Sequence, residues 1–264
     1  MATKKTGTQV AKWDEELARQ AELAAKMEAN AGGGQFFTTK GGVLAWQDAP
    51  MPGNQMAVVI LDHIMENVYY EGAFDPDNPS SPTCFAFGRD DAKMTPHQTV
   101  VDAGNAQYGA AKLCQGCPMN EFGTAIVGKG KACKNTRRLA MIPAGQFDQR
   151  GRFQLTNDEE HFETTTVGFM KLPVTSVKGY AGFVKQVAGA LRRPPHGIIT
   201  KVHVKPDPKN QYVVLFEPIQ NVPDNLMAAV MKRHEEVKSV IEFPYQLGDG
   251  EEKPKKPAKK GRKY

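Results

Sequence analysis

The chain has 264 residues, 40% of them hydrophobic and 24% charged, which is enough to bury one substantial core with a small second lobe. No apolar run is long enough to span a bilayer, so a membrane partner is not expected. The net charge of +5 comes from the C-terminus, because residues 253–264 contain six Lys, one Arg and no acid. The remainder is close to neutral, so a polyanion-binding surface on it requires local clusters of Lys and Arg.

The N-terminal half begins with an amphipathic pattern over residues 9–30, followed by a hinge at Ala31-Gly32-Gly33-Gly34. Such a helix would dock on the core or pair with a second protomer. The strands predicted next cover residues 36–38, 42–46 and 56–61, the last continuing as a curved strand through 67–70. Residues 72–134 are rich in Pro, Gly, Asp and Asn and show little periodicity. A bare loop of that length is unusual in a compact domain, so we expect an inserted subdomain.

Regular patterns resume in the C-terminal half. Strands are predicted at 138–143 and 164–170, a helix at 176–191, a hairpin from 197–204 to 212–216, and a last helix that begins at Pro223-Asp224. The apolar face of the last helix is Leu226, Val230, Val237 and Ile241. This order predicts an α+β fold, mainly β. An OB-like, partly open barrel with N- and C-terminal helices suits it, and a generic α+β sheet fits nearly as well.

Three regions are therefore expected along the chain. Residues 1–35 form the N-terminal helix and Gly hinge. Residues 36–247 form the OB-like domain, with the inserted subdomain at about 72–134. Residues 248–264 form a basic tail that we expect to be disordered.

The four cysteines of the chain all lie within the insertion: they are Cys84, Cys114, Cys117 and Cys133. Cys114-Gln115-Gly116-Cys117 supplies two ligands from one tight turn, and four thiolates suit a tetrahedral, structural Zn²⁺ site. Disulfides are not expected, because no apolar signal segment precedes the chain and cytosolic thiols stay reduced. His97 is an alternative ligand in place of Cys84.

A basic strip at 128–138 overlaps the last cysteine and is the best candidate for binding phosphates. Its positive residues are Lys129, Lys131, Lys134, Arg137 and Arg138. Trp46 and Tyr70 are the aromatic residues that we expect to stack on bases. The other nearby aromatics, Tyr69, Phe85 and Phe87, are more typical of a core.

Catalytic patterns are weak in this sequence. Asp75, Asp77, Asp90 and Asp91 occur near Pro and Gly, where carboxylates usually form turns. Glu159-Glu160-His161 lacks a second histidine four residues on. Four cysteine ligands would also leave zinc without an open position for water, so we expect a scaffold and not an enzyme.

The cysteine cluster, the basic strip and the strand order together resemble the zinc-containing single-stranded DNA-binding replication proteins of tailed bacteriophages, over roughly residues 36–245. This resemblance implies sequence-independent binding of single-stranded DNA during phage replication, recombination and repair, in the cytoplasm of the infected host cell. It implies the ligand role for the four cysteines and phosphate binding for the nearby Lys and Arg. The basic tail departs from the family, whose members usually end in an acidic tail.

Two other functions remain open. The chain could be a zinc-ribbon interaction module that docks a phage or host polymerase, with the N-terminal helix as the docking element. It could also be a nuclease or annealing factor with a divalent ion among the aspartates of the insertion. Replication or recombination proteins, and further copies of the chain, are candidate protein partners.

Overall fold

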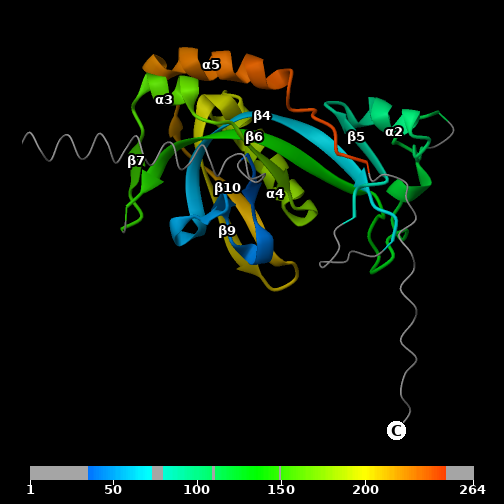
Figure 1. Cartoon of the computed structure of the whole chain (residues 1–264). Helices are drawn as coiled ribbons and strands as arrows, with labels where there is room; N and C mark the ends of the chain where they lie inside the picture. Colours follow the sequence, from blue (N-terminus) through cyan, green and yellow to red (C-terminus); the bar gives the residue numbers. More distant parts are fainter. Residues whose placement is uncertain (1–34, 73–79, 109–110, 149, 248–264) are drawn as a thin grey trace, which may run out of the picture. The chain divides into compact units, whose positions relative to one another are not determined.

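The computed structural model describes residues 35–72, 80–108, 111–148 and 150–247. Its fold is α+β, mainly β, with antiparallel sheets (Figure 1). The chain divides into two compact units: unit 1 contains Met1–Met65 and Thr136–Glu242, and unit 2 contains Glu66–Asn135 and Phe243–Tyr264. The helix predicted at 9–30, its hinge, and the tail at 248–264 lie outside the described residues.

The larger sheet has seven strands within the described residues. They are β4 (Gln55–Tyr69), β5 (Cys84–Gly88), β6 (Lys134–Phe147), β7 (Phe153–Leu155), β8 (Gly168–Leu172), β9 (Ile198–Asp207) and β10 (Gln211–Asn221). The order is β10-β9-β4-β6-β7, with β5 paired to β4 and β8 paired to β6. The long strand predicted from residue 56 to 70 is β4, and the predicted hairpin is β9–β10. Strand order in this part of the chain does not close into a barrel.

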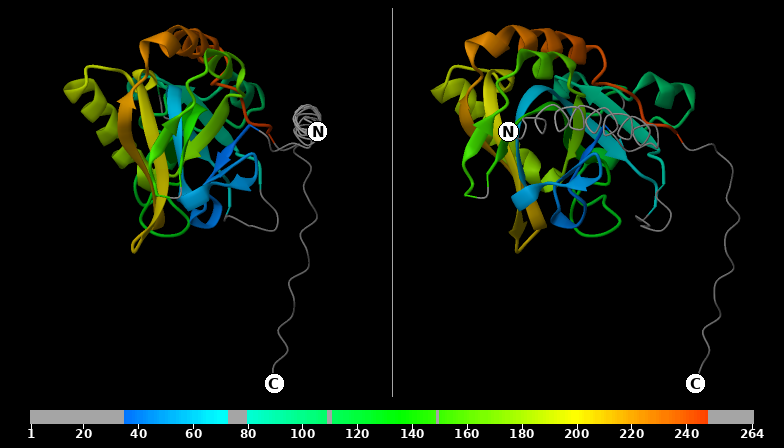
Figure 2. Two further views of the ribbon diagram at one scale, coloured as in Figure 1. Left: turned by 90° about the vertical axis from the view of Figure 1, so that its left-hand side faces the viewer. Right: turned by 60° about the vertical axis from the view of Figure 1, so that its left-hand side comes forward.

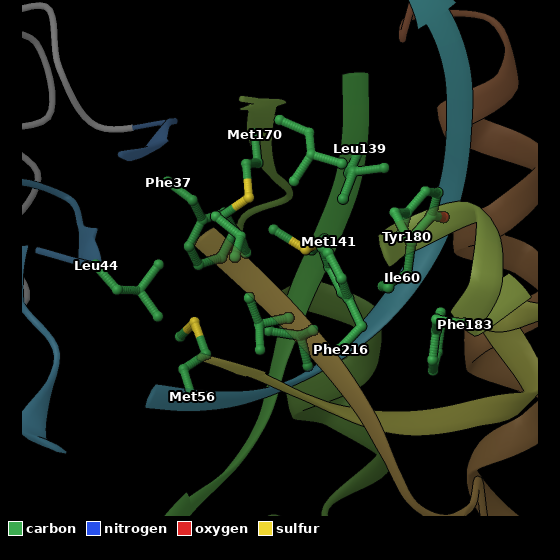
Figure 3. Packing of buried hydrophobic residues seen from close by; sticks show 14 of the residues in the cluster. Phe37, Leu44, Met56, Ile60, Leu139, Met141, Met170, Tyr180, Phe183 and Phe216 are labelled. Atoms are coloured by element: carbon green, nitrogen blue, oxygen red, sulfur yellow. The ribbon is translucent and has the colours of Figure 1, made fainter. Parts of the chain in front are cut away.

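The core of unit 1 follows from the alternation of side chains along these strands. Met56, Val58 and Ile60 of β4 belong to one buried cluster. Figure 3 shows Met56 and Ile60 among its members. The helix α4 (Val177–Ala190), predicted at 176–191, adds Tyr180 and Phe183 to the same cluster. The other members are Phe37, Leu44, Leu139, Met141, Met170, Leu172, Val187, Ile198, Val202, Val204, Val214 and Phe216.

A small sheet of β1 (Phe37–Thr38), β2 (Ala45–Trp46) and β3 (Ala49–Pro50) packs beside β8. The rings of Phe37 and Trp46 stack with centroids 4.1 Å apart. Gly168 lies directly against both rings, because a Cβ built on it would be 2.2 Å from Trp46 Cζ3 and 2.3 Å from Phe37 Cε2. A glycine at this position is therefore needed for the small sheet to approach β8.

Gly168→Ala is expected to lower the free energy of unfolding by about 1–3 kcal/mol, since two packed rings must move to make room for the methyl group. The matched control is Gly179→Ala in α4, where a Cβ would meet nothing within 4 Å. That control should raise stability by about 0.5–1 kcal/mol, because alanine favours a helix. Urea unfolding of the two variants measures both changes, and a loss of the same size in both would contradict the assignment.

The helices α3 (Glu159–Thr164) and α5 (Asp224–Lys238) lie side by side (Figure 1 and Figure 2). The strand predicted at 164–170 was wrong at its start, because Thr164 is the last residue of α3 and β8 begins only at Gly168. It forms where Asp158 accepts a hydrogen bond from the backbone N–H of Glu160, a typical helix N-cap. The predicted apolar face of α5 is confirmed for Leu226, Val230 and Val237, which are buried. Ile241 is also buried, but it follows the helix, which ends at Lys238.

His196 packs its ring on His234 of α5, with centroids 4.1 Å apart. Burial, and then the charge of His234, hold the pKa of His196 below its usual value of 6.5. The unfolded state therefore binds a proton more readily, so stability should fall as pH drops below about 6.5 and level off below the folded-state pKa. His196→Gln should reduce this loss between pH 8 and pH 5 in urea unfolding. If the free energy of unfolding of His196→Gln falls by as much between pH 8 and pH 5 as that of the unchanged protein, His196 is not the source of this pH dependence.

Unit 2 contains less regular structure. Besides β5 and the C-terminal end of β4, it has the short helix α2 (Gln98–Asp102) and a core cluster of Val68, Cys84, Phe85 and Val100. Short 3-10 turns complete the structure of both units: η1 (Lys40–Gly42), η2 (Pro52–Asn54), η3 (Asp91–Lys93), η4 (Pro118–Asn120), η5 (Val174–Ser176) and η6 (Pro195–Gly197). None of the helices among the described residues is long and apolar enough to cross a membrane.

Candidate functional site

The four cysteines line one small cavity of unit 2, about 10 Å³ in volume. The cavity has roughly the room of one water-sized sphere. We call it the cysteine cavity; it is also lined by Asn67, Tyr69, Phe85, Ala86, Gln107 and Met119. The sequence predicted the convergence of these thiols across an insertion with little regular structure.

Backbone hydrogen bonds place each thiol at the cavity. The N–H of Cys117 donates to the carbonyl of Cys114 across the turn, in which Gly116 has a φ of +75°, a value that favours glycine. The N–H of Cys114 donates to the backbone carbonyl of Met94, and the N–H of Cys133 donates to the backbone carbonyl of Met119 at 2.7 Å. Cys84 is brought in by β5, the strand that pairs with β4.

Burial dominates the protonation chemistry of the cavity. It raises the pKa of Cys114 to about 11 and that of Cys133 to about 12, and the neighbouring thiols add to both shifts. The pKa of Cys84 is raised for the same first reason. Four thiolates would repel one another here, and a cation is what would stabilise them together.

Four thiols that line one small cavity have the ligand chemistry of a structural zinc site. Among the described residues, however, no group of three or more His, Cys, Asp or Glu is arranged so that it could hold a metal ion. His97 does not line the cavity. Its Nδ1 accepts a hydrogen bond from the N–H of Thr99, and its ring stacks on Phe85 at 5.2 Å.

A larger groove adjoins the cysteine cavity in unit 2, with a volume of about 600 Å³. Tyr69 and Met119 line both of them. The groove is also lined by Tyr70, Gly72, Ser80, Thr124, Ala125, Ile126, Val127, Ala132 and Lys134. Cys133 lies between two residues that line the groove, Ala132 and Lys134. A metal bound to Cys133 would therefore hold this part of the groove wall in place. The walls carry one positive charge and no acid among the described residues.

One wall is a finger loop at 121–132 that is held by its own hydrogen bonds. The N–H of Gly123 and the N–H of Ala125 both donate to the carbonyl of Gly130. The hydroxyl of Thr124 accepts from the N–H of Ala132 and donates to the carbonyl of Glu121. The loop therefore presents its tip in a defined shape, which matters because that tip is apolar.

Large apolar side chains are exposed on the finger loop. Phe122 is 81% exposed, Ile126 65% and Val127 83%. Lys131 lies over the Phe122 ring, 5.3 Å from its centroid. Exposed apolar groups beside cations, on a loop with fixed backbone bonds, indicate a contact surface.

The basic strip is divided between the two units. Lys129 and Lys134 are exposed on unit 2, and Lys131 is half-buried, donating to Asn120 Oδ1 at 3.2 Å. Arg137 and Arg138 belong to unit 1. Arg138 is only 3% exposed and donates to the carbonyl of Ile241, which removes it from the candidate ligand surface.

Of the two aromatic residues predicted to stack on bases, only Tyr70 lines the groove. Trp46 is in unit 1, where its ring is stacked on Phe37 and packed on Gly168. Its role there is packing of the small sheet. Asp90 of the insertion caps η3 and pairs with Lys93 at 3.5 Å.

Sequence reasoning missed the groove residues Met119, Ile126 and Val127. The available signal was apolar residues in an aperiodic, glycine-rich loop next to a Lys cluster. Tyr69, which the sequence predicts to be a core residue, does pack against the core cluster of unit 2, but it is half-buried and also lines both the cavity and the groove.

Comparison of the chain with models of known protein families, with curated proteins and with solved structures found no match.

Proposed function

We propose that the protein binds single-stranded DNA without sequence preference and without catalysing a reaction. The observation that carries this proposal is the groove of unit 2, whose described lining residues are mostly aromatic and apolar and include one lysine and no acid. Unpaired bases have flat apolar faces and a phosphate on each nucleotide. A groove of this chemistry is complementary to both parts of such a strand.

In this proposal the bases contact Tyr69, Tyr70 and the apolar residues of the finger loop. Lys129, Lys131 and Lys134 neutralise the phosphates that run along the groove. Stacking is tolerant of sequence because every base has a π-face, so little sequence preference follows. Duplex DNA binds more weakly, since its base faces are stacked on one another and cannot enter the groove.

Zinc belongs to the proposal as a structural cofactor. Cys84, Cys114, Cys117 and Cys133 would hold it, and when bound it would supply a cross-link between three separate segments, since Cys114 and Cys117 share one turn. Cys133 sits in the groove wall between Ala132 and Lys134. The chain's own part is to bring the four thiols to one cavity and to attach the finger loop to them.

The finer fold and the biological setting are also proposals. We propose that unit 1 is an OB-like, partly open barrel, supported by the antiparallel order β10-β9-β4-β6 and by α4 packed on the core. The setting we propose is phage DNA replication, recombination and repair in the infected host cell, because of the family resemblance carried by the cysteines and the basic strip.

Fluorescence anisotropy with labelled oligo-dT and with duplex DNA of the same length, at two salt concentrations, tests the function. We expect tighter binding to oligo-dT and affinity that falls steeply with salt. Tyr70→Ala should weaken binding by about 1–3 kcal/mol, or roughly 5- to 150-fold. Lys134→Ala should weaken it less and reduce the salt slope by about 0.7.

The matched control is Lys93→Ala, which removes the same charge from an exposed residue of unit 2 that does not line the groove. It should leave affinity almost unchanged. Equal, weak binding to both DNAs, or the same loss in all three variants, would overturn the proposal.

A second candidate function is docking to a polymerase or other replication protein. The observation that favours it is the exposure of Phe122, Ile126 and Val127, since large exposed apolar side chains are typical of protein contacts. In that case replacing these residues would abolish polymerase binding and leave oligo-dT affinity unchanged.

A further inference from the structure

The strand β9 of unit 1 carries a row of basic residues on the face of the sheet that is opposite the core. Val202 and Val204 belong to the buried cluster of unit 1. Because side chains alternate along a strand, the residues between and beside them point to the other face. These residues are Lys201, His203 and Lys205, which we call the basic row.

Lys201 reaches from β9 across β4 to a pair of aromatic rings. It pairs in register with Ala57 of β4, and β4 lies between β9 and β6 in the sheet. Its Nζ atom is 5.6 Å from the centroid of the Phe147 ring on β6. Phe147 pairs with Phe153 of β7, with ring centroids 5.8 Å apart. Both rings are half-buried, so this face presents a cation beside two partly exposed aromatic rings.

A carboxylate of the neighbouring strand β10 occupies the position of an anion on this face. Oε2 of Glu217 is 3.7 Å from Nζ of Lys201, and Oε1 of Glu217 is 3.0 Å from Nε2 of His203. The side chain of Glu217 is 51% exposed, and ion pairs of this kind contribute little to stability. A phosphate group carries the same sign of charge and can therefore replace the carboxylate at small cost.

His203 adds a polar atom that has no use in the folded chain. The residue is 4% exposed, and its Nε2 makes no hydrogen bond among the described residues, because the contact with Glu217 does not have hydrogen-bond geometry. Burial holds the pKa of His203 below its usual value of 6.5, so Lys201 supplies the positive charge beside Glu217 at neutral pH. A buried polar atom without a partner is costly, and a ligand that bonds to it removes that cost.

We propose that this face of unit 1 is a second contact surface for single-stranded DNA, and that Glu217 competes with the DNA phosphates for it. Phe147 and Phe153 contact bases, and the basic row contacts phosphates. A phosphate that displaces Glu217 is bound by Lys201 and by Nε2 of His203. Flat rings beside cations suit a polymer that has a base and a phosphate in every repeat. The inference rests on the proposed function but uses none of the groove residues.

The first test is Glu217→Gln in the full chain, measured by the anisotropy of labelled oligo-dT. Because this change removes a carboxylate that competes with phosphate, the affinity should rise about 3- to 10-fold at low salt. Damage to a binding face lowers affinity, so a rise is specific to competition. The matched control is Glu163→Gln, which removes the carboxylate of another ion pair of unit 1, 3.9 Å from Lys232, and should leave affinity almost unchanged.

Two further variants test the groups that attract the strand. Lys201→Met keeps the alkyl chain that crosses β4 and removes the charge. It should weaken binding about 3- to 10-fold and reduce the salt slope by about 0.7, whereas Lys232→Met should change neither. Phe147→Leu keeps an apolar side chain and removes the flat ring, so it should weaken binding about 3- to 20-fold with the salt slope unchanged.

The outcomes separate this surface from the groove. No binding of oligo-dT by the unchanged chain would overturn both. Weaker binding by Tyr70→Ala, with unchanged affinity in Glu217→Gln and Lys201→Met, would overturn the second surface alone. Equal rises in Glu217→Gln and Glu163→Gln would show a general charge effect, and a loss in Glu217→Gln would show that the carboxylate stabilises the face; either result overturns the competition. Binding of a polyglutamate peptide that responds to these variants, with oligo-dT binding unaffected, would assign the face to an acidic protein partner and also overturn the proposal.

Discussion

Cys117→Ser is expected to lower the free energy of unfolding of unit 2 by at least about 3 kcal/mol and to abolish stoichiometric zinc binding. Structural zinc contributes about 10–16 kcal/mol in small metal-dependent domains, and a serine is a poor substitute for a thiolate. One described core cluster of unit 2 contains only four buried residues, Val68, Cys84, Phe85 and Val100, and one of them is a proposed zinc ligand. Metal content by mass spectrometry and hydrogen exchange at 66–135 measure the two effects.

Ala86→Ser is the matched control for this variant. Ala86 lines the same cavity and is 1% exposed, so the substitution adds a similar hydroxyl without removing a thiol. It should cost about 1–3 kcal/mol, as burial of a hydroxyl does, and keep the bound zinc. Equal zinc content in both variants, or rapid exchange spread over unit 1 as well as unit 2, would rule out the four-cysteine site.

The periodic elements could be predicted from the sequence because packing follows the same period. α4, α5 and the β9–β10 hairpin agree with prediction, and the predicted apolar residues that lie within α5 are buried. α3 was missed because six residues are too few to show a helical period, although Asp158 followed by two glutamates is an N-terminal signal. Thr164 to Thr166 then looked like the start of a strand.

The candidate site was predictable in its chemistry and only partly in its geometry. Four cysteines with one Cys-x-x-Cys turn predict a shared site, whatever path the chain takes between them. Which side chains are exposed depends on tertiary contacts that have no period. Arg138 and Lys134 are both cations of one basic strip, yet Arg138 is buried against Ile241 and Lys134 lines the groove.

Trp46 shows the same limitation among the aromatics. It and Tyr70 were equally plausible stacking residues, since each follows a strand-like segment. The small sheet packs Trp46 on Gly168, a contact that joins residues 122 positions apart in the chain. The residues near Trp46 and near Gly168 in the sequence give no sign that the two are in contact.

Val127→Asp is expected to weaken oligo-dT binding by about 2–4 kcal/mol, or roughly 30- to 1,000-fold, with almost no change in stability. Val127 is 83% exposed, so the folded state loses little packing when it is replaced. No acid lines the groove among the described residues, so the new carboxylate would remove an apolar contact and repel the phosphates of a bound strand.

Val174→Asp makes the same chemical change at an exposed valine of unit 1, which is 49% exposed, and should leave affinity unchanged. Because both variants lower the net charge equally, a general electrostatic effect predicts equal losses. A large loss confined to Val127→Asp therefore identifies the groove itself as the contact surface. If the two variants bind equally well, base contact in the groove is excluded, and docking of a protein partner becomes the better explanation for the exposed finger loop.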